Sequence, residues 1–337
     1  MRTAGIICEF NPFHRGHAHL LRETRARSGP DTGILCLMSG NFVQRGEPAI
    51  YDKWTRAAMA VEGGVDLLSF GSERGALEPL QKTAALLESP DFDSALRRHL
   101  REGVSFARAR ELALGDLGGD GTVLQTPNNA LGVDYLRSLL RLHSSIQPMT
   151  IPRDESCPSA SELRVQLLAA DQPEQVRYSL FYGEQAVLAV LRRLPDSAFE
   201  RAPFGSEGLW SKVMKAARKE PSIDGILMAC KSKRYAYTRL RRMLLCLYLG
   251  LSGSDLERPV PYLRVLAFND RGRAMLRQLG KTSRLPLVSG QVPRDPASQA
   301  YFQMECRATD LGALLAQPGA AVPTGREKGT PPVYKNP

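Results

Sequence analysis

The sequence EFNPFHRGHAHL at residues 9–20 contains three of the chain's five histidines. It follows a short apolar run, TAGIICE at residues 3–9, and leads into a helical pattern that ends at Gly29. A second apolar run, GILCLM, occupies residues 33–38. Strand, glycine-containing turn, helix and strand in this order predict an α/β fold with a Rossmann-like parallel sheet.

The turn at the end of the first predicted strand has the composition of a phosphate site. His14 and His17 flank Arg15 and Gly16 there. A helix N-terminus presents free N–H groups and partial positive charge, and glycine allows close approach of the backbone. Two imidazoles could donate hydrogen bonds to phosphate oxygens and stabilise charge that develops there. The alternative is a helix start that carries histidines by chance.

The rest of the first 165 residues continues the α/β pattern. Asp52 is predicted to cap a helix that ends at Gly63 and Gly64. The further predicted elements are a strand at 65–70, a helix within 71–89, a helix at 94–113, a loop at 115–129, a helix at 130–142 and a strand at 148–153.

From about residue 160 the patterns become mostly helical, with one possible strand, VLAF, at residues 265–268. Residues 317–337 are rich in Gly, Pro and charge and predict an extended tail. The sequence therefore predicts a nucleotide-binding domain at 1–165, a mostly helical, basic domain at 166–316 and a tail at 317–337.

Composition narrows the class of protein. The chain has 337 residues, 43% of them hydrophobic, and a net charge of +10, which favours a polyanionic partner but also fits a merely basic enzyme. The N-terminal apolar run predicts a strand and not a signal peptide, and no segment reaches the roughly 20 apolar residues of a membrane span. We expect a cytoplasmic protein with no membrane association. The six cysteines are scattered, which predicts free thiols and no zinc site.

The turn NPFHRGH resembles the HxGH signature of the nucleotidyltransferase superfamily, which has a Rossmann-like fold. This resemblance implies that His14 and His17 bind the phosphates of ATP. It also implies that Asn11 and Pro12 shape the turn. Because ATP usually arrives with Mg²⁺, we expect that ion too, with no metal ligands assigned in the chain.

Other stretches resemble one family within that superfamily, the tRNA(Met) cytidine acetate ligases. The matching stretches cover nearly the whole chain in the same order: MSGNFVQRGEPAIYDKWTRAAMA (38–60), FGSERG (70–75), PNNALGVDYL (127–136), SASELR (159–164), KSKRYAYTRLRRMLL (231–245) and TPPVYKN (330–336). The resemblance implies that ATP and acetate form acetyl-adenylate. The acetyl group is then transferred to the wobble cytidine of elongator tRNA(Met). This chemistry requires no protein nucleophile, and the sequence contains no Ser-His-Asp or Cys-His arrangement.

The family's nucleotide contacts carry over by motif to three groups of residues. They are Ile6, Ile7, Glu9, Phe10, Asn11, Pro12, Gly16 and His19 in the first turn, then Gly71, Asn128 and Arg153, and finally Ser159, Ser161 and Arg164 at a predicted helix start. Plain alternatives exist: Gly71 as a turn residue, Asn128 as a cap for a helix near Ala130, Arg153 as a surface residue after a strand, and His19 as an ordinary helix residue outside the motif. Gln44, Arg45 and Lys53 are further candidates for acetate or RNA contact.

The densest basic run, KSKRYAYTRLRRM at residues 231–243, predicts the RNA-binding segment. Its cations are Lys231, Lys233, Arg234, Arg239, Arg241 and Arg242, interleaved with Tyr235 and Tyr237. Basic residues for phosphates and aromatics for stacking are typical of RNA binding. The spacing places Arg234 and Arg241 on one helical face. A solvated helix face is the alternative. Secondary basic candidates are Lys212, Lys215, Arg218, Lys219, Arg271 and Arg273.

Two departures from the family pattern stand out. A strand and helix that the family carries near residues 66–69 are missing, and so is a loop after Arg153. Two other functions therefore stay open beside the ligase. One is a small-molecule adenylyltransferase, which would keep the histidine turn but needs no basic helical domain. The other is a non-catalytic tRNA-binding descendant of the ligases.

Overall fold

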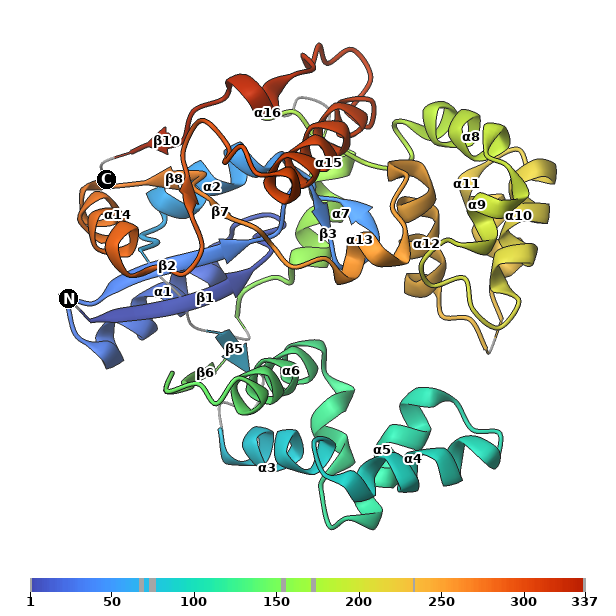
Figure 1. Cartoon of the computed structure of the whole chain (residues 1–337), viewed down its shortest axis with the longest axis horizontal. Coiled ribbons are helices and arrows are strands. Elements are labelled where there is room, and N and C mark those ends of the chain that lie inside the picture. The colour runs from blue at the N-terminus through green and yellow to red at the C-terminus, as the bar shows by residue number, and fades with distance from the viewer. Residues whose placement is uncertain are drawn as a thin grey trace. The chain divides into compact units, whose positions relative to one another are not determined.

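The computed structural model describes residues 2–66, 70–72, 77–152, 156–170, 174–232 and 234–335 (Figure 1). The chain forms two compact units, each assembled from separate stretches. Unit 1 comprises Met1–Cys8, Arg15–Leu37 and Leu67–Pro158, and unit 2 comprises Glu9–His14, Met38–Asp66 and Ser159–Pro337. The functional division predicted at residues 165 and 316 stays a prediction.

The strands of unit 1 confirm the predicted α/β pattern. Strand β1 (Thr3–Cys8), helix α1 (Arg15–Ser28) and strand β2 (Gly33–Met38) follow in order, and β1 pairs with β2. Strands β5 (Phe70–Ser72) and β6 (Thr150–Pro152) pair in parallel. The guanidinium of Arg27 in α1 donates to the carbonyl of Thr150 at 3.2 Å, which ties the helix to β6.

Helices fill the rest of unit 1: α3 (Glu78–Leu87), α4 (Pro90–Arg101), α5 (Phe106–Asp116), the 3₁₀ helix η1 (Gly121–Gln125) and α6 (Pro127–Arg141). Their apolar faces share a core that includes Leu80, Phe92, Leu114 and Val133. Burial of such faces is the main source of helix stability in a folded chain.

Three predicted boundaries in unit 1 were wrong. The helix expected at 94–113 is two helices, because Gly103 at φ +81° turns the chain and Ser105 caps a new helix. The loop expected at 115–129 contains η1 and the start of α6, where Pro127 occupies the first turn that proline tolerates. Of the strand expected at 65–70, Phe70 is the first residue of β5, residues 65 and 66, which belong to unit 2, are not in a strand, and residues 67–69 lie outside the described part.

The second stretch of unit 2, Met38–Asp66, contains a hairpin and a helix. Strands β3 (Phe42–Val43) and β4 (Glu47–Pro48) are antiparallel, and α2 (Lys53–Glu62) follows. The carboxylate of Asp52 accepts a hydrogen bond from the N–H of Thr55 at 2.9 Å, so Asp52 is the predicted cap. Gly63 closes the helix, as expected.

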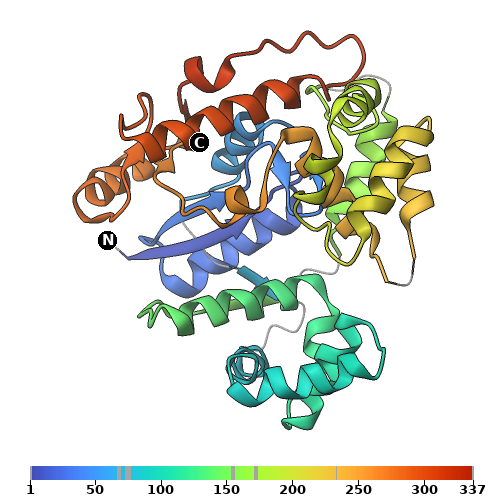
Figure 2. The same ribbon diagram turned by 45° about the vertical axis from the view of Figure 1, so that its right-hand side comes forward.

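The predicted helical region of unit 2 is confirmed. Its helices are α7 (Ala160–Ala169), α8 (Glu184–Arg193), α9 (Asp196–Glu200), α10 (Leu209–Lys219), α11 (Ile223–Cys230), α12 (Tyr237–Leu249) and α13 (Gly253–Glu257). Figures 1 and 2 both show α8 to α12 gathered into one bundle. Leu191, Phe199, Val213, Ile226 and Met243 are buried in its core.

The last part of unit 2 mixes helices with short parallel strand pairs. Its elements are β7 (Leu263–Arg264), β8 (Ala267–Phe268), α14 (Asp270–Thr282), β9 (Leu287–Val288), α15 (Pro296–Ala313), α16 (Arg326–Gly329) and β10 (Val333–Tyr334). Strand β8 confirms the strand expected at VLAF, and it pairs in parallel with β10. The expectation of an extended tail at 317–337 needs correction, because α16 and β10 are folded onto unit 2.

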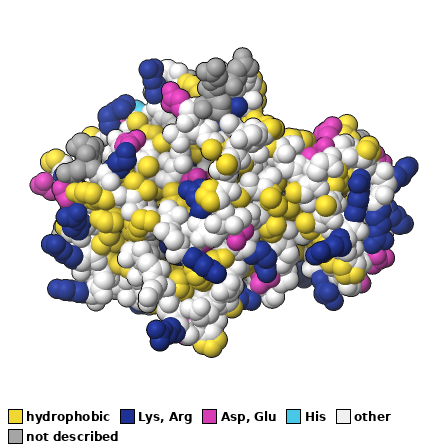
Figure 3. All heavy atoms as spheres, turned by 90° about the horizontal axis from the view of Figure 1, so that it is seen from above, with side chains coloured by type: hydrophobic (Ala, Val, Ile, Leu, Met, Phe, Trp, Pro, Cys, Tyr) yellow, Lys and Arg dark blue, Asp and Glu magenta, His cyan; other side chains and the backbone are white. Residues whose placement is uncertain are grey.

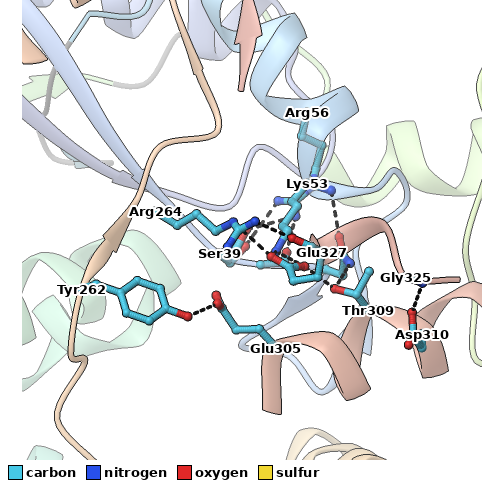
Figure 4. Close-up of polar contacts among 12 residues, drawn as sticks. Ser39, Lys53, Arg56, Tyr262, Arg264, Glu305, Thr309, Asp310, Gly325 and Glu327 are labelled. Carbon is cyan, nitrogen blue, oxygen red and sulfur yellow. Dashed lines mark hydrogen bonds and ion pairs between the residues drawn. The ribbon is translucent and has the colours of Figure 1, made fainter. Parts of the chain in front are cut away.

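A buried ion pair holds that tail. Glu327 of α16 is fully buried, and both of its carboxylate oxygens accept from Nζ of Lys53, at 2.7 and 2.6 Å. The hydroxyl of Thr309 donates to Oε2 at 2.7 Å, and Nε of Arg264 lies 3.1 Å from Oε1 (Figure 4). A charge removed from water needs such partners to be tolerated.

A partly buried acid, Glu305, lies near this network. The hydroxyl of Tyr262 donates to the carboxylate of Glu305 (Figure 4). Burial raises the pKa of Glu305, and burial together with the neighbouring carboxylate raises the pKa of Tyr262. All six cysteines are free thiols, as predicted. Within the described residues, no helix is both long and apolar enough to cross a membrane.

We expect Glu327→Gln to lower the free energy of unfolding by about 3–5 kcal/mol, because the charge of Lys53 would stay buried without its counter-ion. The measurement is urea denaturation at neutral pH. Lys335→Gln is the matched control, since it removes an ion pair of the same tail that is half exposed, with Glu62 at 2.7 Å. That change should cost less than about 1 kcal/mol. Equal losses in the two variants would contradict the role given to the buried pair.

Candidate nucleotide site

The turn after β1 is tightly buried. Phe10 is 1% exposed and has φ +44°, which is a strained conformation for an aromatic residue, and its ring packs edge-on against Phe13 at 5.2 Å. The peptide bond between Asn11 and Pro12 is cis. Behind the turn, a Cβ on Gly63 would lie 2.2 Å from the ring of Phe13. Only glycine at the end of α2 therefore leaves room for this turn.

Asn11 organises the turn through both its side chain and its backbone. Its Oδ1 accepts from the N–H of Ile50 at 2.7 Å, and its carbonyl accepts from Nη1 of Arg164 at 2.8 Å. Its Nδ2 is buried and has no hydrogen-bond partner among the described residues. A buried amide N–H without a partner is costly, so this donor suits a ligand oxygen.

The start of α7 supplies the second predicted phosphate element. Ser159 caps the helix in a reciprocal pair with Glu162, in which the Ser159 hydroxyl accepts from the Glu162 N–H at 3.2 Å. The hydroxyl of Ser161 accepts from Nη2 of Arg164 at 3.1 Å. Burial is the main cause that lowers the pKa of the Arg164 guanidinium. The predicted helix start is confirmed, and its serines already have partners within the chain.

Arg56, on α2, clamps the ends of the surrounding segments. It is fully buried, and its guanidinium donates to the carbonyl of Ser39 at 3.1 Å (Figure 4). The same guanidinium donates to the carbonyls of Glu9 and Gly40 and to that of Tyr51 at 3.1 Å. These carbonyls belong to three separate stretches of chain. One fixed fork of donors thus holds the turn, the segment after β2 and the segment before α2 together.

The sequence did not single out Arg56, because it sits in an ordinary helical pattern. Lys53, which was a candidate for acetate or RNA contact, is 5% exposed and is paired with Glu327. Its ammonium group therefore binds Glu327 in the C-terminal segment and is not exposed for contact with acetate or RNA. Gln44 and Arg45 are exposed on the hairpin tip.

Several predicted nucleotide contacts belong to unit 1. In β1, Ile6 is 1% exposed and Ile7 is 42% exposed, and Gly16, His17 and His19 lie in the first two turns of α1. His14, half-buried, is the last residue of its stretch in unit 2.

The remaining predicted contacts lie further along unit 1. Gly71 lies in β5 opposite Ile151. Asn128 is in the first turn of α6, so it does not cap a helix near Ala130. Arg153 lies outside the described residues.

The basic run around α12 differs from its expected geometry. Helix α12 begins at Tyr237, so Arg234 precedes it and does not share a helical face with Arg241. The ring of Tyr235 is 9% exposed and its hydroxyl donates to the carbonyl of Glu207 at 2.6 Å, which removes it as a stacking platform. Lys233 lies outside the described part of the chain.

The arginines of that run contact neighbouring residues. Arg239 and Arg234 lie 3.2 and 3.4 Å from the Glu207 carboxylate, Arg241 lies 2.7 Å from that of Glu47, and Arg242 donates to the carbonyl of Gln44 at 2.6 Å. Lys231 is exposed, and its ammonium has no partner among the residues described.

Other exposed cations lie nearby in the same bundle. Lys212, Lys215, Arg218 and Lys219 of α10 are all exposed, and Arg218 pairs with Asp196. Figure 3 shows Lys and Arg side chains gathered at the end where α8 to α11 lie. Lys215 and Lys219 make no ion pair with any described residue, so they are free to meet an anion.

The chain matches a known family model, described as HIGH Nucleotidyl Transferase, over residues 1–68, 67–199 and 174–323. The chain belongs to this family of nucleotidyltransferases. The expected α/β, Rossmann-like fold class is thereby confirmed.

Closer relatives define the family further. A tRNA(Met) cytidine acetate ligase of Thermoanaerobacter sp. (strain X514) is 34% identical over 93% of this chain and 95% of its own length. That of Anoxybacillus flavithermus is 30% identical over 99% and 100%. The crystal structure of Thermotoga maritima TmcAL bound with alpha-thio ATP superposes with a TM-score of 0.90 at 26% identity and covers both chains fully. The chain belongs to the tRNA(Met) cytidine acetate ligase family.

The relatives also carry residues that this chain lacks. The alignment with the Thermoanaerobacter protein runs over 389 positions, more than the 337 residues present here. The predicted places of the missing segments are residues 66–69 and the loop after Arg153. Residues 67–69 and 153–155 lie outside the described residues, so these places stay predictions.

We expect Arg56→Met to cost about 3–5 kcal/mol of unfolding free energy, because four carbonyls would lose their buried donor. The loss should appear in urea denaturation. It should be accompanied by weaker ATP binding in calorimetry at a temperature where the variant is folded. Arg22→Met, at an exposed position of α1, should change stability by less than about 0.5 kcal/mol. An Arg56→Met protein as stable as the wild type would refute the clamp.

Proposed function

We propose that this chain is an ATP-dependent ligase that activates acetate and acetylates the wobble cytidine of elongator tRNA(Met). The observation that carries the proposal is the 2.8 Å hydrogen bond from Arg164 to the carbonyl of Asn11. It brings together two elements that the sequence predicts as phosphate contacts and that lie 153 residues apart. The names of the relatives point to the same reaction.

In the first step, an acetate oxygen attacks the α-phosphorus of ATP. The bond from that phosphorus to the bridging oxygen breaks, and pyrophosphate leaves with the electron pair. The chain must stabilise negative charge on the phosphates during this displacement, which donors of fixed position do well. We assign this task to His14, His17 and Arg164, with Nδ2 of Asn11 as a further donor.

In the second step, the exocyclic amine of cytidine attacks the acetyl carbon. The carbon–oxygen bond to AMP breaks, the amine loses a proton, and N4-acetylcytidine and AMP are the products. The protein's part is to hold the tRNA so that the amine meets the acyl carbon, because positioning alone can supply much of the rate. No nucleophile of the chain is required.

Magnesium would enter as the partner of the ATP phosphates, since Mg²⁺ keeps several waters and commonly binds substrate phosphates. The described residues contain no group of three or more His, Cys, Asp or Glu side chains that could hold a metal ion. Binding of tRNA and acetate, and a cytoplasmic location, belong to the same proposal.

Pyrophosphate release from ATP and Mg²⁺, with and without acetate and with and without tRNA(Met), tests the adenylating step. Release should depend on acetate and fall by about 10²–10³-fold in His14→Ala and His17→Ala, because each removes a donor to the developing charge. His143→Asn, which changes an exposed histidine after α6 that has φ +46°, is the control and should keep full activity.

The other functions give different outcomes. Pyrophosphate release that does not depend on acetate and that requires a second nucleotide-like substrate would indicate a small-molecule adenylyltransferase. Retention of tRNA on a gel by a folded protein that releases no pyrophosphate would indicate a non-catalytic tRNA-binding descendant. Either result would overturn the proposal that this chain is an acetate-dependent ligase.

We propose that Lys231, Arg234 and the exposed lysines of α10 contact the phosphates of tRNA. Arg239, Arg241 and Arg242 mainly hold the 231–243 segment in its conformation. Changing Lys215, Lys219 and Lys231 to Gln should weaken tRNA binding at least about tenfold and reduce the slope of log Kd against log salt by about 2–3. The measurement is a filter-binding titration at several salt concentrations between about 50 and 200 mM, a range over which protein–nucleic acid affinity falls steeply.

The matched control changes three exposed cations of unit 1, Lys82, Arg97 and Arg101, to Gln. It removes the same charge from the chain. A loss of affinity in the control equal to that in the α10 variant would show that net charge, and not this surface, determines binding.

A further inference from the structure

The tip of the hairpin of β3 and β4 contacts two other segments of unit 2. Val43 pairs with Glu47, and the three residues between them form the tip, where Gly46 has φ +81°. On one side, the N–H of Gln44 donates to the carboxylate of Glu9 at 2.9 Å. The hairpin is thereby attached to the turn that carries Asn11 and His14.

On its other side, the hairpin tip lies directly on the backbone of α12. A Cβ at Gly46 would lie 2.4 Å from the backbone nitrogen of Arg242, so only glycine permits this approach. The carbonyl of Gln44 accepts from Nε of Arg242 at 2.6 Å. Two backbone contacts therefore set where the hairpin meets the helix.

Glu47 stands between two arginines of different elements. Its Oε2 lies 2.7 Å from Nη1 of Arg241 on α12, and its Oε1 lies 3.8 Å from Nε of Arg164 on α7. The side chains of Glu47 and Arg164 are only 19% and 15% exposed. Arg241 also stacks on Tyr237 at 4.9 Å. Water screens a partly buried arrangement of this kind poorly.

Without Glu47, the cations would repel one another. Burial is the largest cause that lowers the pKa of Arg164, and the positive charges of Arg45 and Arg241 lower it further. The negative charge of Glu47 acts in the opposite direction and raises that pKa. Arg164 keeps two further partners, the carbonyl of Asn11 and the hydroxyl of Ser161. The carboxylate of Glu47 is thus a third partner of Arg164, beside the carbonyl of Asn11 and the hydroxyl of Ser161.

We propose that Glu47 is a positioning residue for the nucleotide step: it holds Arg164 against the Asn11 turn by bridging it to Arg241 at the start of α12. The proposal rests on the proposed function, because it takes Arg164 as a phosphate contact. It also makes the predicted RNA segment and the predicted nucleotide site share one carboxylate, so a change in Arg241 is felt by Arg164.

The sign of the effect separates positioning from simple electrostatics. Glu47→Gln removes a negative charge and keeps the size of the side chain. A simple field effect would tighten the binding of ATP, which is an anion. Loss of positioning would weaken it, because Arg164 would no longer be held in place.

The experiment measures the Kd of ATP by calorimetry, and the kcat and KM for ATP in acetate-dependent pyrophosphate release, on the full chain without tRNA. We expect Glu47→Gln to raise the Kd and KM of ATP about tenfold or more with a smaller change in kcat. Glu47→Asp should recover part of the loss. In the Glu47→Gln background, Arg241→Met should have no further effect on the Kd of ATP, although alone it should change it.

Glu88→Gln is the matched control, since Glu88 also binds two arginines, Arg137 at 2.6 Å and Arg141 at 2.7 Å, both on α6 of unit 1. It should leave the Kd of ATP unchanged. Thermal melting identifies any variant that fails to fold, and Glu47→Asp then carries the test. Equal or tighter ATP binding by folded Glu47→Gln would overturn the proposal, whereas a wild-type chain that binds no ATP would instead overturn the proposed function.

Discussion

The guanidinium of Arg56 is the constraint on which the arrangement of the site depends. It is fully buried on α2 and hydrogen-bonded to carbonyls from the turn at Glu9, from Ser39 and Gly40, and from Tyr51. A buried cation has no favourable place other than among such acceptors. The turn, the hairpin segment and α2 therefore form one rigid assembly within unit 2.

The same helix extends this dependence to the end of the chain. Lys53, one turn before Arg56, is neutralised by Glu327, which α16 carries. Asn41 accepts from the N–H of Lys53 at 2.9 Å and donates to Thr309 at 3.2 Å, so the buried network also includes α15. The C-terminal segment consequently supports the helix that supports the turn. Two buried cations on α2 thus connect the C-terminal segment, through Lys53 and Glu327, to the turn after β1, through Arg56 and Glu9.

Charge is distributed differently over the surface of the bundle. The arginines near the start of α12 pair with Glu207, Glu47 and backbone carbonyls, whereas Lys215 and Lys219 of α10 are exposed and make no ion pair with any described residue. Arginine suits fixed, multidentate contacts and lysine suits mobile contacts with phosphate. This difference supports the proposal that the arginines position segments of the chain and that the exposed lysines contact a polyanion.

The sequence by itself determined the local structure and the candidate chemistry: β1, α1 and β2, the Asp52 cap, the helix start at Ser159 and the turn with His14 and His17. Each depends on neighbours along the chain, through periodicity, capping or turn formation. Only the tertiary structure decided that Lys53 pairs with Glu327, that the tail is folded, that Tyr235 is buried and that Glu47 joins Arg164 to Arg241. Those contacts link residues that are far apart in sequence. The sequence shows where the charged residues are, but it does not show whether each one is solvated by water or paired with a distant side chain.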